Sequence, residues 1–201
     1  MSKRRSAQLP KSPASTGLPP RIAADSAQQR PDDRIALAQR LVGEGARLLA
    51  AKRPGEAAEI LSEAWELDPQ NAAAAINLGG AYILQGKHER AIPALEAATR
   101  LEPDNPMAWV NLAAAYLGKL PFATQERQDQ AIAAFERAVA LNPRTPQVHY
   151  NLGLIFLERD DLGRAADCFR DALDTDPTDR DAQHWLDQIS RRAETPRASQ
   201  G

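Results

Sequence analysis

Apolar and small residues recur at helical spacing through most of the chain, and the clearest stretch runs from residue 71 to residue 105. Asn71 precedes four alanines, and an asparagine oxygen can accept hydrogen bonds from the free backbone amides of a helix start. The apolar positions then return every three or four residues up to Gly86, where a glycine favours a turn. A second helical pattern runs to Leu101, and Pro103 ends the unit because proline lacks the backbone donor that a helix needs. The stretch therefore predicts two amphipathic helices joined by a tight turn.

The same pattern occurs four times. The closing prolines of the first two units are 34 residues apart, as are those of the last two, whereas six extra residues are inserted in the third unit. The first predicted helix of each unit has a small residue at one shared position, namely Gly45, Gly79, Ala113 and Gly153. The second predicted helix has a large residue at a matching position, namely Leu61, Leu95, Phe135 and Phe169. Since small residues let two helices approach and large ones fill the remaining space, the pattern predicts four stacked helical hairpins.

This period and this small–large alternation resemble the tetratricopeptide repeat (TPR) family. The resemblance implies an all-α fold, a right-handed α-solenoid of four helix-turn-helix units at about 38–71, 72–105, 106–145 and 146–179. We expect a C-terminal capping helix at 178–192, because a solenoid needs a polar cover over its last apolar face. Together these elements make a TPR domain at 32–192.

Both ends of the chain differ in composition from the repeats. Residues 1–31 are rich in proline and basic residues and poor in apolar ones, which predicts a disordered basic tail, and residues 193–201 predict a second disordered tail. No apolar run is long enough to span a membrane and no secretory signal is evident, so the expected location is cytoplasmic. The alanine- and arginine-rich composition hints at a bacterial origin. The net charge of −2 gives no reason to expect nucleic acid or a membrane as partner.

The chain shows no recognisable chemistry of catalysis. Cys168 is the single cysteine, which excludes a disulfide framework within the chain, and the three histidines lie in separate units. The acidic run around Asp176 lacks the glycine and the glutamate that a calcium loop needs. We therefore expect no enzyme activity, no metal, no cofactor and no small-molecule substrate.

The resemblance places the first helix of each unit on the concave face of the superhelix. There Asn77, Asn111 and Asn151 occupy the same repeat position, and an amide can both donate to and accept from the backbone of an extended peptide. Apolar residues are expected on the same face: Ile76, Ile83, Met107, Val110, Leu117, Tyr150, Leu154 and Leu157. The inserted turn adds Leu120 and Phe122, which either pack over a neighbouring turn or form a secondary contact with a partner.

These residues favour a non-enzymatic adaptor or scaffold that binds an extended, partly apolar segment of another protein. The TPR clamp for acidic chaperone tails is disfavoured, because its basic positions hold Val42, Met107 and Asn111. Two alternatives stay open. The chain could be a self-associating structural protein that forms homo-oligomers, or an autoinhibited binder whose N-terminal tail, through Leu9, Leu18 or Ile22, lies in its own groove.

Overall fold

The structure, a computed structural model, describes residues 30–119, 123–145 and 147–194. The two predicted disordered tails fall almost entirely outside these residues, and Leu120 and Phe122 of the inserted turn lie outside them as well. In the described residues the chain is all-α, with nine helices and no strand: α1 (Pro31–Ala50), α2 (Pro54–Leu67), α3 (Ala72–Leu84), α4 (His88–Leu101), α5 (Pro106–Leu117), α6 (Gln125–Leu141), α7 (Val148–Glu158), α8 (Leu162–Thr175) and α9 (Arg180–Glu194).

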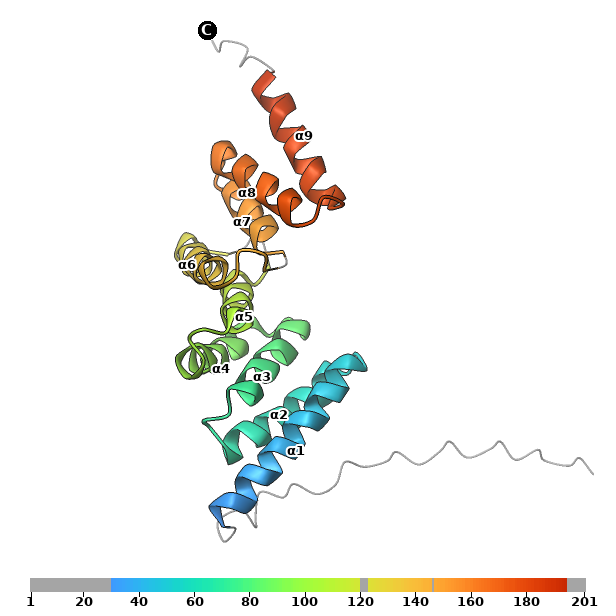
Figure 1. Cartoon of the computed structure of the whole chain (residues 1–201), viewed down its shortest axis with the longest axis vertical. Coiled ribbons are helices and arrows are strands. Elements are labelled where there is room, and N and C mark those ends of the chain that lie inside the picture. The colour runs from blue at the N-terminus through green and yellow to red at the C-terminus, as the bar shows by residue number, and fades with distance from the viewer. Residues whose placement is uncertain (1–29, 120–122, 146, 195–201) are drawn as a thin grey trace, which may run out of the picture.

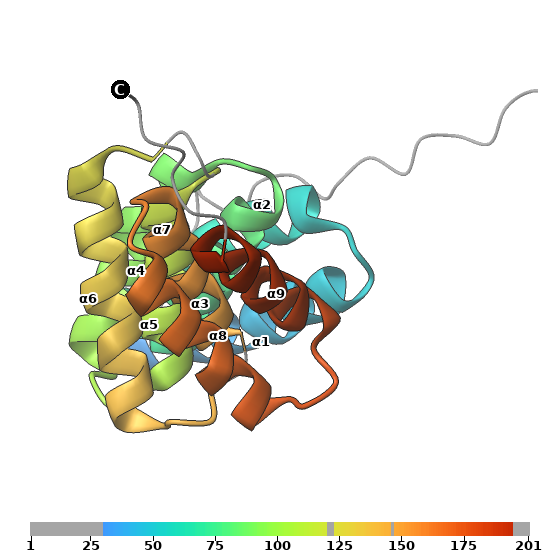
Figure 2. The same cartoon turned by 90° about the horizontal axis from the view of Figure 1, so that it is seen from above.

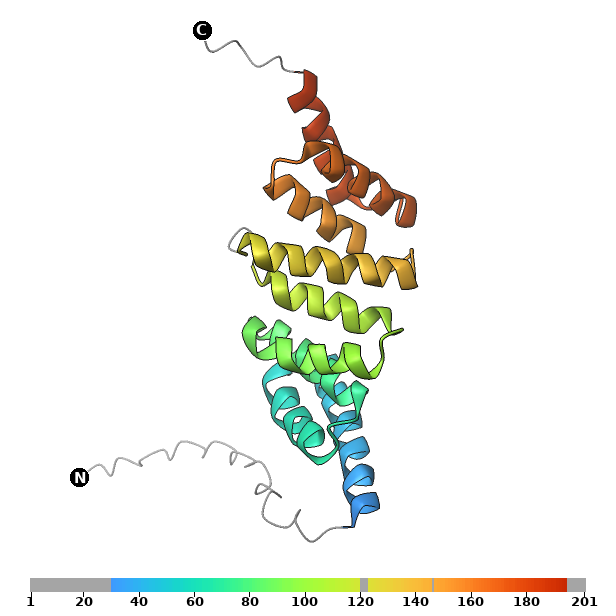
Figure 3. The same ribbon diagram turned by 90° about the vertical axis from the view of Figure 1, so that its left-hand side faces the viewer.

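The helices stack in sequence order into an elongated solenoid (Figures 1 and 3). Each helix contacts the next, and α3 also contacts α1 and α5, so the first helices of the first three units lie side by side. Figure 2, seen along the long axis, shows that successive hairpins are turned relative to one another about that axis. The predicted all-α solenoid is therefore confirmed.

Small residues of the first helices pack directly on large residues of the second helices, as the sequence pattern predicts. A Cβ atom built on Gly79 would lie 2.3 Å from Cγ of Leu95, and one built on Gly153 would lie 2.7 Å from Cε1 of Phe169. Leu95 and Phe169 are fully buried, as is Phe135 in the third unit. These close approaches fix the pairing of the two helices within each hairpin.

Asparagine caps begin the second and third units, as predicted. Oδ1 of Asn71 accepts a hydrogen bond from a backbone amide in the first turn of α3, at 3.0 Å. Oδ1 of Asn105 likewise accepts a hydrogen bond from a backbone amide in the first turn of α5, at 3.0 Å. Pro106 follows at the first position of the helix, where a backbone amide would have no hydrogen-bond acceptor within the helix. The two helices therefore start in the same way, which keeps their faces in register.

Three other helix starts differ from these two. Thr145 is buried and its hydroxyl donates to the carbonyl of Asn142 at 2.6 Å, so α7 begins only after Gln147, whose φ is 62°. At the start of α9, the side chain of Asp179, and not that of the preceding Thr178, accepts from the first-turn amides at 3.0 Å. The two acidic residues at the start of α1 lie inside its first turn and make no capping hydrogen bond.

The first helix is the longest, with 20 residues. A guanidinium nitrogen of Arg34 donates to the carbonyl of Leu67 at 3.3 Å, at the C-terminal end of α2. A cation is favourable there because the free carbonyls of a helix end carry partial negative charge. Arg34 thus holds the additional N-terminal turns of α1 against the first hairpin. None of the helices in the described ranges is long and apolar enough to cross a membrane.

Candidate peptide-binding groove

Three asparagines stand at the same position of three neighbouring units: Asn77 on α3, Asn111 on α5 and Asn151 on α7. Each is half-buried, and none of their side-chain amides hydrogen-bonds to another described residue. Each lies two residues before the small residue that faces the second helix of its unit. Two residues correspond to about 200° around a helix, so each asparagine lies on the side opposite that contact. The three amides thus lie on the first-helix side of the solenoid, with free donors and acceptors.

Apolar side chains accompany the three amides. The residue immediately before each asparagine is large and apolar and is half-buried: Ile76, Val110 and Tyr150. Ile83, Leu154 and Leu157 are also half-buried, and Met107 is 48% exposed. These seven side chains are accessible in part, which is the exposure that a peptide-binding surface requires. We call the three asparagines and these seven residues the groove residues.

Leu117 differs from the other predicted groove residues. It is only 8% exposed and belongs to the largest core cluster, together with Phe135 and Leu152. It therefore offers almost no surface to a ligand, and it is left out of the groove residues. Leu84, in contrast, was not predicted, although it is 66% exposed at the C-terminal end of α3. Its position directly before the turn is the sequence signal that could have identified it.

A cleft of about 670 Å³ lies at the fourth unit, and Tyr150 is the one groove residue in its lining. One wall carries Arg144 and Gln147, and the other carries Asp176, Asp179 and Asp181. A hydrogen bond from the Thr178 hydroxyl lowers the pKa of Asp176, so this wall is anionic at neutral pH. The sequence did not predict this cleft, because its lining combines Arg144 of the third unit, residues from both ends of the fourth unit and Asp181 of α9, which meet only in the folded array.

Two kinds of reactive centre can be checked in the described part, a metal site and an activated cysteine. No group of three or more histidine, cysteine or acidic residues in these ranges is placed to hold a metal ion. Burial, and then the carboxylates of Asp171 and Asp167, raise the pKa of Cys168 to about 11. The thiol is therefore protonated at neutral pH, and a thiol is a far weaker nucleophile than a thiolate.

The tetratricopeptide repeat family matches this chain twice, over residues 48–109 and over residues 122–180. Together the two matches cover more than half of the chain and include parts of all four predicted units. The chain belongs to the tetratricopeptide repeat family. Proteins with these repeats generally act as non-enzymatic modules that bind protein partners.

Solved structures of other repeat proteins share this fold. MamA from Desulfovibrio magneticus RS-1 is 24% identical and has a TM-score of 0.62, with 71% of this chain and 77% of that chain covered. TTC0263, a thermophilic TPR protein of Thermus thermophilus, is 21% identical with a TM-score of 0.62 and coverage of 78% and 83%. The first TPR of Spaghetti (RPAP3), bound to the HSP90 peptide SRMEEVD, is 24% identical with a TM-score of 0.54 and coverage of 63% and 98%. At these identities the likeness concerns the fold, and no curated protein matches the chain.

Proposed function

We propose that this protein is an adaptor whose groove residues bind an extended, partly apolar segment of another protein. The observation that carries the proposal is the amide repeated at one position of three units, Asn77, Asn111 and Asn151, each half-buried and without a hydrogen-bond partner among the described residues. The amide atoms are not among the buried polar atoms that lack a partner, so they are accessible to solvent. A peptide backbone would replace that solvent by supplying both a donor and an acceptor to each amide.

The apolar groove residues supply the second half of the interaction. Ile76, Val110 and Tyr150 each stand next to one amide in the sequence, so each of the last three units pairs one polar residue with one apolar residue. Such an alternation suits an extended chain, whose backbone groups and side chains point in different directions. Met107, at 48% exposed, is the most exposed apolar side chain of the groove residues, and its flexible thioether can adapt to different partners.

An acidic chaperone tail is not the ligand that these residues favour. RPAP3 is similar in fold and is bound to a peptide that ends in acidic residues. In this chain the corresponding clamp positions hold Val42, Met107 and Asn111, which carry no positive charge to neutralise a carboxylate. We infer that the partner segment is neutral and apolar at these positions.

The proposal is tested with the full chain and a peptide selected against it from a random library of twelve-residue peptides. The double variant Asn111→Ala, Asn151→Ala should weaken the selected peptide about 10- to 100-fold, because each lost hydrogen bond contributes roughly 1 kcal/mol. Gln130→Ala is the matched control, since it removes an exposed amide from α6 without touching the groove residues. Fluorescence polarisation measures the affinity and circular dichroism checks helicity. Equal affinity of the double variant and the control would refute the proposal.

A further inference from the structure

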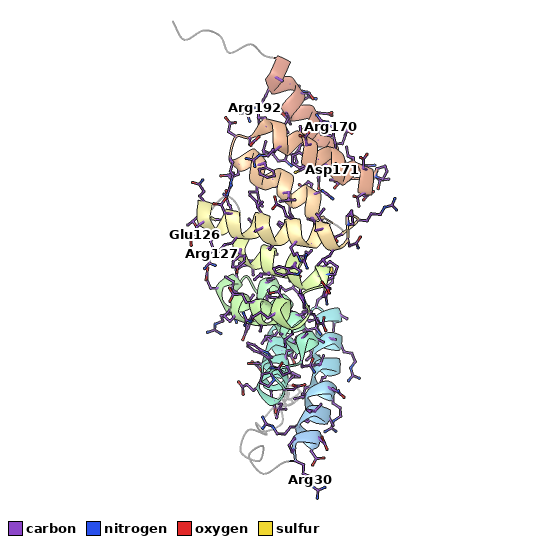
Figure 4. All side chains as sticks on the ribbon, turned by 60° about the vertical axis from the view of Figure 1, so that its left-hand side comes forward. Arg30, Glu126, Arg127, Arg170, Asp171 and Arg192 are labelled. Atoms are coloured by element: carbon purple, nitrogen blue, oxygen red, sulfur yellow. The ribbon has the colours of Figure 1, made fainter. Side chains whose placement is uncertain are left out.

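A second cleft lies between the second helices of the third and fourth units, α6 and α8, over α7. It has a volume of about 420 Å³ and contains none of the groove residues. Its apolar lining comprises Val139, Leu152, Phe156 and Cys168. Its rim carries Glu136 from α6 and Asp171 from α8, and Asp171 is labelled in Figure 4.

The first two junctions between units are each filled by a tryptophan. At the first junction Trp65 of α2 packs against a buried cluster of alanines from the following units, Ala75, Ala98 and Ala108. At the second junction Trp109 of α5 packs against the core clusters on both sides of it. Nε1 of Trp109 donates to the carbonyl of Pro103 at 2.8 Å, which fixes the indole in place. The tryptophan at the first junction thus belongs to the second helix of the preceding unit, whereas the tryptophan at the second junction belongs to the first helix of the following unit.

The third junction has no tryptophan at either position. The residue that corresponds to Trp65 is Val139, and the residue that corresponds to Trp109 is His149. Nε2 of His149 lies 3.1 Å from the carbonyl of Pro143, the same contact that Trp109 makes in the unit before. An imidazole lacks the second ring of an indole. His149 therefore keeps the polar contact with the proline carbonyl but fills less of the junction than a tryptophan would. The cleft of about 420 Å³ is found at this junction.

The rim of the cleft is anionic. Residues 145–179 contain eight acidic and three basic residues. Asp167 of the lining pairs with Arg170, whereas Glu136 forms no ion pair with another described residue. Asp171 lies 3.7 Å from Nδ1 of His149, an imidazole that is charged only when protonated. Arg164, the basic residue of the lining, is already engaged, since it pairs with Asp161 at 2.6 Å and stacks over the Phe156 ring at 4.3 Å. The cleft therefore suits an aliphatic side chain with a cation close to it.

The chain itself contains a segment of that chemistry. Residues 1–29 hold five basic residues and one acidic residue, so the rest of the chain, from residue 30 on, carries a net charge of −6. Leu9 lies two residues before Lys11. Arg30 is the first residue that the structure describes, and Leu9 precedes it by 21 residues. A fully extended chain of 21 residues spans about 70 Å. From α1 to α7 the array has six steps between neighbouring helices, each about 8–10 Å between helix axes. Because the helices alternate between two layers, the direct distance is shorter than the sum of these steps, about 60 Å at most, and the extended tail is long enough to cover it.

We propose that the segment around Leu9 and Lys11 occupies this cleft in the same molecule, with Leu9 over the apolar lining and Lys11 beside Glu136 and Asp171. The second apolar and basic pair of the tail, Arg21 and Ile22, is too close to Arg30 to reach it: eight extended residues span only about 26 Å. The tail would thus cover the cleft between α6 and α8, which contains none of the groove residues.

Cys168 lines the cleft and is the only cysteine of the sequence, so its reaction rate with N-ethylmaleimide reports whether the cleft is covered. In the full chain, the variant Leu9→Asp, Lys11→Glu should raise this rate at least fivefold, because the segment no longer protects the thiol. The matched control Arg21→Glu, Ile22→Asp should leave the rate unchanged. Equal rates in the wild type and the first variant would overturn the proposal, and a larger effect in the control would overturn the choice of segment.

A photo-crosslinking amino acid at Leu9 provides the second measurement. We expect crosslinks to peptides of α6 or α8, and their loss in the variant His149→Trp, which fills the cleft while the groove residues stay unchanged. Mixing isotopically heavy and light chains shows whether crosslinks join residues of one molecule. Crosslinks between heavy and light chains would overturn the placement within one molecule, and crosslinks that persist in His149→Trp would overturn the cleft as the docking site.

Discussion

Gly79 and Gly80 are adjacent in α3, yet replacing each of them with alanine should have opposite effects on stability. A Cβ atom on Gly79 would lie 2.3, 2.5 and 2.8 Å from three side-chain carbons of Leu95, whereas one on Gly80 would have nothing within 4 Å. Leu95 is fully buried, so it cannot move out of the way into solvent. The same substitution therefore forces a clash at one position and only removes the helix-destabilising effect of glycine at the other.

The magnitudes follow from these contacts. Carbon atoms in ordinary contact are about 3.5–4.0 Å apart, so Leu95 would have to retreat by more than about 1 Å. Overpacking of a buried site destabilises a protein by roughly 1–3 kcal/mol, and the better helix propensity of alanine offsets up to about 1 kcal/mol of that. We expect Gly79→Ala to lower the free energy of unfolding by roughly 0.5–2 kcal/mol and Gly80→Ala to raise it by about 0.5–1 kcal/mol.

Urea unfolding followed by circular dichroism measures this difference. With an m-value of about 1–3 kcal/mol per molar urea, the midpoints of the two variants should be about 1 M apart. In the background Leu95→Ala the penalty of Gly79→Ala should vanish, because the clashing atoms are gone, while the gain from Gly80→Ala should persist. If Gly79→Ala is as stable as Gly80→Ala, the reasoning about close helix packing is refuted.

Three further predictions concern single side chains. Asn105→Ala removes the cap of α5 and should lower the free energy of unfolding by about 1 kcal/mol in the same urea assay, with an unchanged stability contradicting the capping role. Arg159→Ala should lower the free energy of unfolding by roughly 1–2 kcal/mol, because Gln128, which is only 6% exposed, loses the guanidinium that donates to it at 2.7 Å. Arg159→Lys should cost less stability than Arg159→Ala, and an equal loss in both variants would contradict this reason. The thiol of Cys168, whose pKa is raised to about 11, should react with N-ethylmaleimide at a rate that rises about tenfold per pH unit between pH 7 and 10, and a plateau near pH 9 would contradict this.

The repeat architecture could be read from the sequence because it depends on spacing within each unit. The pairs Gly79–Leu95 and Gly153–Phe169 are contacts between two helices of one hairpin, and the sequence separation of such partners is constant. The capping asparagines Asn71 and Asn105 were likewise predictable, since a cap acts on the residues that directly follow it.

What the sequence did not predict depends on neighbouring units. Leu117 follows the groove spacing, yet the core cluster that includes residues of α6, α7 and α8 buries it. Thr145 occupies a capping position but bonds back to Asn142, and the next helix starts later. The cleft between α6 and α8 arises where residues of the third and fourth units meet, and the cleft beside Tyr150 combines residues of the third unit, the fourth unit and α9. A single repeat therefore contains the complete lining of neither.

The distribution of the three tryptophans gives the protein an uneven set of intrinsic optical probes. Trp65 and Trp109 sit at the first two junctions, and Trp185 on α9 stacks on Phe169 with ring centroids 6.5 Å apart. Changes in tryptophan fluorescence therefore report loosening of the first two junctions or of the contact between α8 and α9. Separation of the third hairpin from the fourth would leave the tryptophan emission spectrum largely unaltered. A spectroscopist who monitors only indole fluorescence would miss that event, which an indole introduced at position 149 would make visible.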